Sequence, residues 1–203
     1  MDTILRNDQP ILTFFWIPKT ASVSISAALY YAFPFSSHEK YKTKQVCYKP
    51  HASINNLSDL EYPALANNRV CVLRHPYERA KSLWQYSVIH IDSYDSDESF
   101  EEFLLKRFYE KHMDYKHATF DPNFFYFYAP QWHWAQHCNI YLDFNNLDKD
   151  FNNLLKKYVM PGIYNLPRKN VLNSKNSVEL KHYHKKIIQK IYADDFEYLG
   201  FEY

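Results

Sequence analysis

Glycine is nearly absent from this chain: Gly162 and Gly200 are the only two among its 203 residues. A Walker A loop needs two glycines close to one lysine, and a dinucleotide-binding fingerprint needs three glycines close together. Neither arrangement exists here. The sequence therefore argues against ATP or GTP binding through a standard glycine-rich loop, and against a Rossmann-type dinucleotide site.

Length and composition indicate an ordinary globular protein with an aromatic core. A chain of 203 residues and 24.5 kDa fits one domain, and we expect a single domain over residues 1–203. Hydrophobic residues make up 46% and charged residues 23% of the chain, which is typical of folded domains. The apolar residues include 19 Tyr, 15 Phe and 4 Trp, so aromatic side chains supply much of the core.

The charge balance and the cysteines limit the partners and the cellular compartment that we expect. With 24 Lys and Arg against 23 Asp and Glu, the net charge of +1 creates no overall field that would collect a polyanion. We therefore expect neither nucleic acid nor a membrane as partner, and any anion site must be a local cluster. Cys47, Cys71 and Cys138 form no C-x-x-C pair, and the N-terminus has no apolar signal segment, so we expect a cytoplasmic protein without a disulfide framework.

Strand and helix patterns alternate along the chain. The sequence predicts strands over residues 11–17, 70–73 and 139–144 and helices over 25–33, from Pro76, from a Ser99–Glu102 capping box, over 147–158 and over 180–191. This alternation favours an α/β fold with a mainly parallel sheet flanked by helices. Ligands of such sheets bind beyond the carboxyl ends of the strands, where two of the strand-to-helix turns lie.

The first of these turns reads Trp16-Ile-Pro-Lys-Thr-Ala-Ser-Val-Ser24. A loop between a strand and a helix N-terminus directs backbone N–H groups and positive potential at one point. Lys19 adds a charge, and Thr20, Ser22 and Ser24 add hydroxyl groups. This composition is typical of a phosphate or sulfate site, although a hydroxyl-rich helix cap with a surface lysine explains the segment equally well.

The second turn reads Leu73-Arg-His-Pro-Tyr-Glu-Arg-Ala-Lys-Ser82. Arg74 follows the predicted strand, where its planar guanidinium could bind a phosphate through two hydrogen bonds. Arg79 and Ser82 are three residues apart on the following helix and share a face. A helix that begins at proline, with Glu78 paired to a nearby base, is the alternative interpretation.

Together the two turns resemble the sulfotransferase superfamily, closest to carbohydrate sulfotransferases of the heparan 2-O-sulfotransferase type. Pro18, Lys19, Thr20 and Ser24 match the family's P-K-T-x-x-T-S loop, and a second set matches its R-x-P-x-x-R-x-x-S segment: Arg74, Pro76, Arg79 and Ser82. Weaker likenesses extend over most of the chain. The resemblance implies a three-layer fold like that of P-loop NTPases.

The resemblance also implies a sulfuryl donor, 3′-phosphoadenosine 5′-phosphosulfate (PAPS), with the bisphosphate PAP as product and no metal. The first loop would hold the 5′-phosphosulfate and the second segment the 3′-phosphate. The implied donor-binding residues are Lys19, Thr20, Ala21, Ser22, Val23, Ser24, Arg74 and Ser82. Lys19 would also neutralise the leaving oxygen during transfer.

Three positions depart from the family pattern. The family usually has His at the position of Trp16, Gly at Ser22 and Thr at Val23. A side chain at position 22 crowds the anion or forbids a positive φ, and Val23 removes a hydroxyl. These departures leave two alternatives open: weak donor binding, or a loop in which the Ser22 hydroxyl replaces a lost contact.

His51, in Lys49-Pro-His-Ala-Ser-Ile54, is the predicted catalytic base. Histidine titrates near neutrality and can take the proton of an acceptor hydroxyl. The role comes from the resemblance, since related sequences place a histidine between the two turns. A solvated loop histidine is the alternative.

Other candidate residues carry weaker signals. His133 and His137 have an i,i+4 spacing that can hold zinc, but no third ligand has a recognisable spacing, so we expect a helix surface. Arg168 and Lys169 lie where the family often brings a loop over the nucleotide. The aromatic stretch 124–134 could line a sugar-binding cleft but fits a buried helix at least as well.

The sequence thus predicts a PAPS-dependent sulfotransferase that acts on a hydroxyl of a carbohydrate or other small molecule. A catalytically degenerate nucleotide-binding module of the same fold is the main alternative, because of Ser22 and Val23. A small-molecule kinase of the same broad fold is disfavoured by the missing glycine-rich loop.

Overall fold

The computed structural model describes residues 1–34, 40–45, 65–90, 98–105, 128–168 and 178–203. The chain divides into two compact units. The first comprises Met1–Arg74 and His133–Asn170, and the second comprises His75–Trp132 and Val171–Tyr203. The predictions for His51, Cys47 and Lys169 lie outside the described residues.

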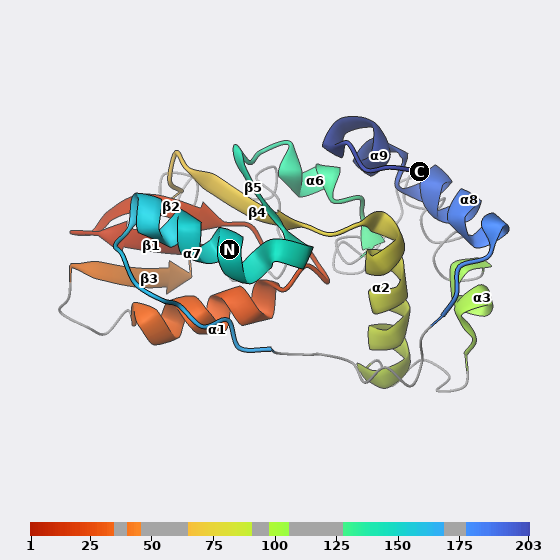
Figure 1. Ribbon diagram of the computed structural model, residues 1–203, viewed down its shortest axis with the longest axis horizontal. Helices are drawn as coiled ribbons and strands as arrows, with labels where there is room; N and C mark the ends of the chain where they lie inside the picture. The colour runs from red at the N-terminus through yellow and green to blue at the C-terminus, as the bar shows by residue number, and fades with distance from the viewer. Residues whose placement is uncertain (35–39, 46–64, 91–97, 106–127, 169–177) are drawn as a thin grey trace, which may run out of the picture. The chain divides into compact units, whose positions relative to one another are not determined.

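The first unit contains a five-stranded sheet in the order β3-β1-β2-β4-β5 (Figure 1). Its strands are β1 (Asp2–Arg6), β2 (Gln9–Phe14), β3 (Tyr41–Gln45), β4 (Arg69–Leu73) and β5 (Ile140–Asp143). β2, β4 and β5 are parallel neighbours, whereas β1 is antiparallel to both β2 and β3. The predicted strands at 11–17, 70–73 and 139–144 are therefore confirmed with shifted ends.

The prediction of a mainly parallel sheet holds only in part for the described strands, because β1 runs antiparallel to both of its neighbours and makes the sheet mixed. The error came from the first eight residues, whose polar composition hid a strand. Asn7 and Asp8 have φ angles of 50° and 64° and join Arg6 to its partner Gln9. Two consecutive positive φ angles form the tight hairpin connection that Asn and Asp tolerate. The Asn-Asp pair was the available sequence signal for this hairpin.

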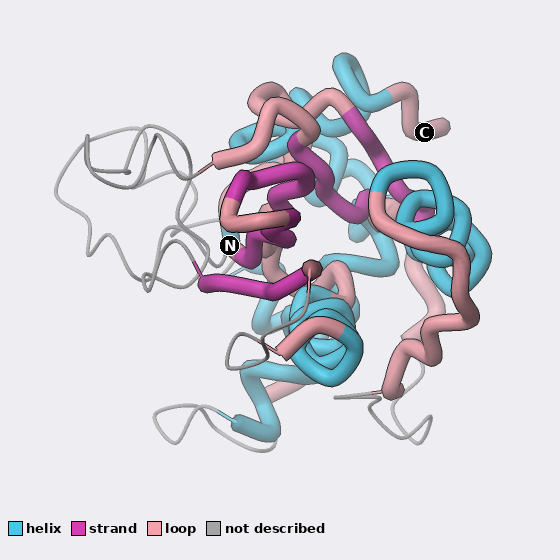
Figure 2. The backbone as a smooth tube through the Cα atoms, turned by 90° about the vertical axis from the view of Figure 1, so that its left-hand side faces the viewer, coloured by secondary structure: helices cyan, strands magenta, loops and turns pink. Residues whose placement is uncertain are grey.

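One face of the sheet packs against α1 (Ser22–Ala32) and α7 (Leu147–Tyr158), as Figure 1 shows. Alternate residues of four strands point into this core, with Leu29 of α1 and Phe151 of α7 buried against them: Ile4, Leu12, Phe14, Val70, Val72 and Leu142. In Figure 2 the strands in magenta gather into this sheet, with helices in cyan beside it.

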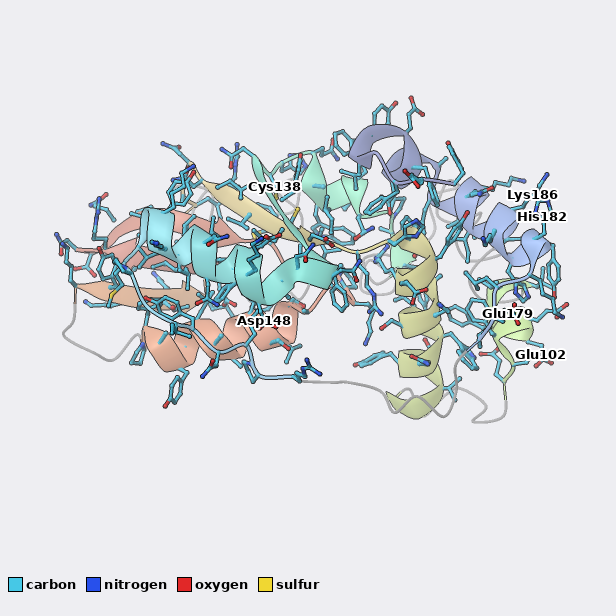
Figure 3. The ribbon with its side chains drawn as sticks, in the orientation of Figure 1. Glu102, Cys138, Asp148, Glu179, His182 and Lys186 are labelled. Carbon is cyan, nitrogen blue, oxygen red and sulfur yellow. The ribbon has the colours of Figure 1, made fainter. Side chains whose placement is uncertain are left out.

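Helix α7 has the predicted bounds, and its charges follow the helix dipole. Asp148, labelled in Figure 3, and Asp150 lie in the first turn, and Lys156 and Lys157 lie in the last turn. Acidic groups near the N-terminus and basic groups near the C-terminus each stabilise a helix. Helix α7 is therefore stabilised both by packing against the sheet and by charges that complement its dipole.

The opposite face of the sheet also buries polar groups in pairs. The hydroxyl groups of Thr3 and Thr13 lie 2.8 Å apart, and Thr13 also accepts the backbone N–H of Ala66 at 2.8 Å. Cys71 and Cys138 are free, buried thiols on this unit, and Cys138 is labelled in Figure 3. Burial raises the pKa of the Cys71 thiol.

The second unit consists of helices around an aromatic core. They are α2 (Pro76–His90), α3 (Phe100–Glu102), α8 (His182–Ile191) and α9 (Ala193–Leu199), and the last was not predicted. The α3 capping box is confirmed: the Ser99 N–H donates to Glu102 Oε2 at 3.0 Å, and the Glu102 N–H donates to Ser99 Oγ at 3.2 Å. Glu102 is labelled in Figure 3.

The short helix α6 (Trp132–Ala135) contains one of the positions at which the chain passes from one unit to the other. Across the described part of the chain, no helix combines the length and the apolar character that a membrane span requires.

Candidate functional site

The loop that links β2 to α1 turns sharply without glycine. Lys19 has a φ of 65° and Ala21 a φ of 68°, while Thr20 between them stays outside the left-handed region. Alternation of left-handed and ordinary residues turns successive N–H groups toward one side of the chain and builds a concavity suited to anions. Left-handed backbone costs non-glycine residues energy, and such strain clusters at functional sites.

A hydrogen bond inside the loop supports this shape. The Thr20 hydroxyl, almost fully buried, donates to the carbonyl of Ile17 at 2.9 Å. In this conformation Thr20 closes the turn with its hydroxyl hydrogen. Thr20 therefore fixes the path of the backbone around Lys19.

Helix α1 begins directly after the strained loop. Its first intrahelical hydrogen bond runs from the N–H of Ile25 to the carbonyl of Ala21 at 3.1 Å. The N–H groups of a first helical turn point out of the helix end, where the dipole also adds positive potential. The end of α1 therefore offers a second set of anion-binding groups next to Lys19.

Ser22 is the first residue of α1 and has no positive φ, so serine at this position causes no backbone strain. The left-handed positions are Lys19 and Ala21 instead. Val23 is 53% exposed, and Ser24 is buried in the helix. The structure therefore brings all six predicted loop residues, 19–24, into one strand-to-helix turn.

Arg74 joins this loop at the carboxyl end of β4. Its Nη1 atom donates to the carbonyl oxygen of Lys19 at 3.2 Å. β2 and β4 are parallel neighbours, with Phe14 opposite Val70, so the two strands end at the same edge of the sheet. Two turns that lie 55 residues apart in the sequence thus meet through one hydrogen bond.

The meeting of two cations changes the acidity of the lysine. Burial, together with the positive charge of Arg74, lowers the pKa of Lys19 from 10.5 to about 8. A lysine whose charged form is disfavoured in this way gains most from an incoming anion. The electrostatics of the turn therefore favour a ligand of negative charge.

The guanidinium of Arg74 lies over an aromatic ring. Its Cζ atom is 4.3 Å from the ring centroid of Phe144, within the range of a cation–π contact. Phe144 opens the short 3-10 helix η4 (Phe144–Asn146), directly after β5. No sequence pattern indicated this contact, because an isolated phenylalanine after a strand is indistinguishable from a core residue.

Trp16, where the family usually has histidine, makes a partly buried hydrogen bond within the sheet unit. Its Nε1 donates to Oδ2 of Asp2 at 2.9 Å. Burial raises the pKa of Asp2, and hydrogen bonds from Ser26 and Trp16 partly offset this rise. The indole therefore fastens the start of the loop to β1.

Arg79 and Ser82 belong to the second unit, and both are buried in α2. Arg79 is fully buried. Its Nη1 donates to the carbonyl of Ala129 at 2.9 Å, and its Cζ lies 5.0 Å from the ring centroid of Tyr192. This second arginine of the motif is therefore embedded in the protein interior.

His133 and His137, the candidates with a zinc-like spacing, both have lowered pKa values. Burial and the charge of His137 lower the pKa of His133 to about 4, and burial and Arg69 lower the pKa of His137. Among the described residues, no three His, Cys, Asp or Glu side chains come together as metal ligands. Arg168 is exposed.

The aromatic stretch at 124–134 lies only partly within the described residues. Tyr128 and Trp134 are buried, as the core interpretation predicts for these two.

Comparison with known proteins identifies the family. The model of the Sulfotransferase family matches residues 2–202. No curated protein and no solved structure matches the chain. The family match spans nearly the whole sequence and includes both turns that meet at Lys19 and Arg74, so the chain belongs to the sulfotransferase family.

Proposed function

We propose that this protein transfers the sulfuryl group of PAPS to a hydroxyl group of a carbohydrate and releases PAP. The observation that carries the proposal is the meeting of Lys19 and Arg74 at one edge of the sheet. Membership of the sulfotransferase family supports sulfuryl transfer as the reaction. The carbohydrate acceptor follows from the closer resemblance to carbohydrate sulfotransferases.

Each end of the donor has a matching group in this proposal. The ammonium of Lys19 and the N–H groups at the start of α1 bind the 5′-phosphosulfate, because both offer hydrogen bonds and positive potential. Arg74 binds the 3′-phosphate through its planar guanidinium. Ser82 is the further predicted contact to that phosphate.

The transfer itself needs positioning and charge neutralisation. The acceptor oxygen attacks sulfur, the bond from sulfur to the 5′-phosphate oxygen breaks, and the acceptor proton passes to a base. Lys19 stabilises the negative charge on the leaving phosphate oxygen. His51 is the proposed base, and its position lies outside the described residues.

The glycine-free loop is compatible with donor binding. The concern about residue 22 was that serine would forbid a positive φ, but Ser22 is an ordinary helical residue. The proposed architecture is the three-layer fold of P-loop NTPases, with residues 16–24 in place of a glycine-rich loop; the five-stranded sheet flanked by helices is compatible with it.

The test combines donor binding with turnover. PAP, ATP and AMP are compared as stabilisers of the protein against heat, since a ligand that binds only the folded state raises its stability. We expect PAP to stabilise most. The protein is then incubated with PAPS and a panel of oligosaccharides, and PAP release and sulfated product are measured.

A variant of the base separates catalysis from binding. We expect His51→Ala to keep its PAP affinity and to lose roughly 10²- to 10⁴-fold in turnover. The exposed His182 provides the control, since His182→Ala should keep full turnover. PAP binding without turnover on any acceptor would contradict an enzyme, and stronger stabilisation by ATP than by PAP would contradict the donor.

A further inference from the structure

We infer that Phe144 is a positioning residue: its ring holds the Arg74 guanidinium in the orientation that binds the 3′-phosphate of the donor. The inference rests on the proposed function of the two turns. It adds a residue that lies outside both sequence motifs. The argument depends on how the guanidinium of Arg74 is held on its different sides.

A hydrogen bond to the Lys19 carbonyl holds the edge of the guanidinium. Nη1 of Arg74 donates to the carbonyl of Lys19, a residue whose φ of 65° turns that carbonyl away from the path of an ordinary strand end. That hydrogen bond holds the edge of the guanidinium, whereas a restraint on its face defines its plane.

The face of the guanidinium supplies that restraint. Its carbon lies 4.3 Å from the ring centroid of Phe144, so the cation covers the negative face of the ring. Phe144 is itself anchored, because its ring packs against the core cluster between the sheet, α1 and α7. The ring therefore forms a fixed platform under a half-buried arginine.

The chain around Phe144 keeps the platform in place. Asp143 ends β5 beside Leu73 of β4, the residue that precedes Arg74. The Asp143 carboxylate accepts the N–H of Asn145 at 2.9 Å and the side-chain amide of Asn146 at 2.8 Å, which closes the turn of η4. The register of β4 and β5, together with the hydrogen bonds of Asp143, places Phe144 next to Arg74.

The consequence is selectivity for one end of the ligand. An arginine held by its edge and by one face presents its remaining N–H groups in a fixed direction, which lowers the entropy lost when they bind phosphate. Removing the ring should therefore weaken ligands that carry a 3′-phosphate and leave ligands without one unaffected.

The main experiment measures two ligands on the same variants by calorimetry. Phe144→Leu keeps an apolar side chain of similar size, whereas Phe144→Trp keeps an aromatic face. We expect the leucine variant to bind PAP roughly 3- to 30-fold more weakly than the unchanged protein, and the tryptophan variant to bind it within about twofold. Adenosine 5′-phosphosulfate, which lacks the 3′-phosphate, should bind all three proteins equally.

A matched control comes from the other end of α7. Tyr158 is half-buried, packs against the same core, and has the Lys157 ammonium 4.8 Å from its ring centroid. It ends a helix of 12 residues that starts just after η4, so it lies roughly 18 Å along the helix from Phe144. Tyr158→Leu should leave PAP binding unchanged.

Two outcomes would overturn the inference. Equal weakening of PAP and of adenosine 5′-phosphosulfate by Phe144→Leu would show a general packing defect. Further weakening of PAP by Phe144→Leu in an Arg74→Ala background would show that the ring acts through another group.

A ligand-free measurement keeps this inference separate from the proposed function. In the unchanged protein the ring current of Phe144 should shift the Arg74 Nε–H nuclear magnetic resonance signal, and Phe144→Leu should remove that shift. An unmoved signal would overturn the positioning role whatever the protein binds. A moved signal in a protein that does not bind PAP would overturn the proposed function and keep the contact.

Discussion

Arg74 and Arg79 belong to the same short motif, yet they occupy opposite kinds of environment. Arg74 is half-buried at the end of β4 and bonds to the carbonyl of Lys19 beneath the surface of a turn. Arg79 is fully buried in α2, bonded to Ala129 and stacked near Tyr192. Five residues of chain thus separate a half-buried arginine from one enclosed by the protein.

The buried arginine is part of a polar network in the second unit. Asp195 interacts electrostatically with Arg79 and accepts the Trp132 N–H at 2.8 Å and the Gln131 side-chain amide at 3.3 Å. Burial raises the pKa of Asp195, while Arg79 and these hydrogen bonds oppose the rise. The comparison teaches that one motif can combine an arginine proposed to bind the donor with an arginine that supports the structure, and that residue type alone does not separate the two.

The largest expected effect is the loss of stability when the buried Arg79 is replaced. Arg79→Met leaves the Asp195 carboxylate and the Ala129 carbonyl buried without their cation, so the free energy of unfolding should fall by about 3–5 kcal/mol. Urea unfolding followed by circular dichroism measures it. Adding Asp195→Asn should recover part of the loss, and a fully stable Arg79→Met protein would contradict the assignment.

For Arg74 we expect the opposite pattern, a larger effect on PAP binding than on stability. Arg74→Ala should weaken PAP binding by about 1.5–3 kcal/mol, the range for hydrogen bonds to charged groups, and should change the free energy of unfolding by less than about 1 kcal/mol. Calorimetry and urea unfolding on the same sample measure both quantities. Comparable losses in binding and stability would remove the distinction between the two arginines.

The pKa of Lys19 leads to a prediction about how PAP affinity depends on pH. Its pKa of about 8 means that the free protein loses the lysine charge above that pH, so PAP affinity should fall by up to about tenfold per pH unit there. Lys19→Arg keeps its charge and should show a flat profile from pH 7 to about pH 9.5. Parallel profiles for the two proteins would contradict the role of the lysine charge.

The contribution of Lys19 to stability should change with pH in the opposite direction to PAP affinity. The folded pKa lies below the ordinary value of 10.5, so the unfolded chain holds more protons on this group between about pH 8 and 10.5. The contribution of Lys19 to stability should therefore rise with pH across this interval. The difference between the unchanged protein and Lys19→Arg isolates it.

The smallest effect should come from the strained loop. Ala21 has a φ of 68°, which glycine adopts without a steric penalty, so Ala21→Gly should raise the free energy of unfolding by about 0.5–1 kcal/mol. Ala27→Gly, inside α1, should instead lower it by about 1 kcal/mol. Thermal unfolding of both variants would show equal losses if the loop carries no strain.

Sequence patterns predicted the parts of the fold that depend on local periodicity. α7 was predicted with its observed bounds, because its apolar stripe and terminal charges agree. β1 was missed, because burial of Asp2 and Thr3 depends on partners elsewhere in the chain. The same limit applies to Phe144, whose role depends on a strand pairing that no local pattern encodes.

The motifs predicted that the turns of Lys19 and Arg74 lie together, but they did not predict the backbone conformation of the first turn. The concern about Ser22 assumed that the left-handed residue lies where the family has glycine. In the structure Lys19 and Ala21 adopt that conformation, supported by the Thr20 and Arg74 hydrogen bonds. Backbone dihedral angles of a loop follow from tertiary contacts, so residue types alone did not reveal them.

The order of the strands has a consequence for how the protein acquires its binding site. β1 and β2 are joined by a two-residue connection and can pair within microseconds, whereas β2 must find β4 across more than fifty intervening residues. The turns that carry Lys19 and Arg74 come together through that distant pairing. Competence to bind the donor should therefore emerge late in refolding, after the N-terminal hairpin, and a folding intermediate that retains the hairpin should be unable to hold the nucleotide.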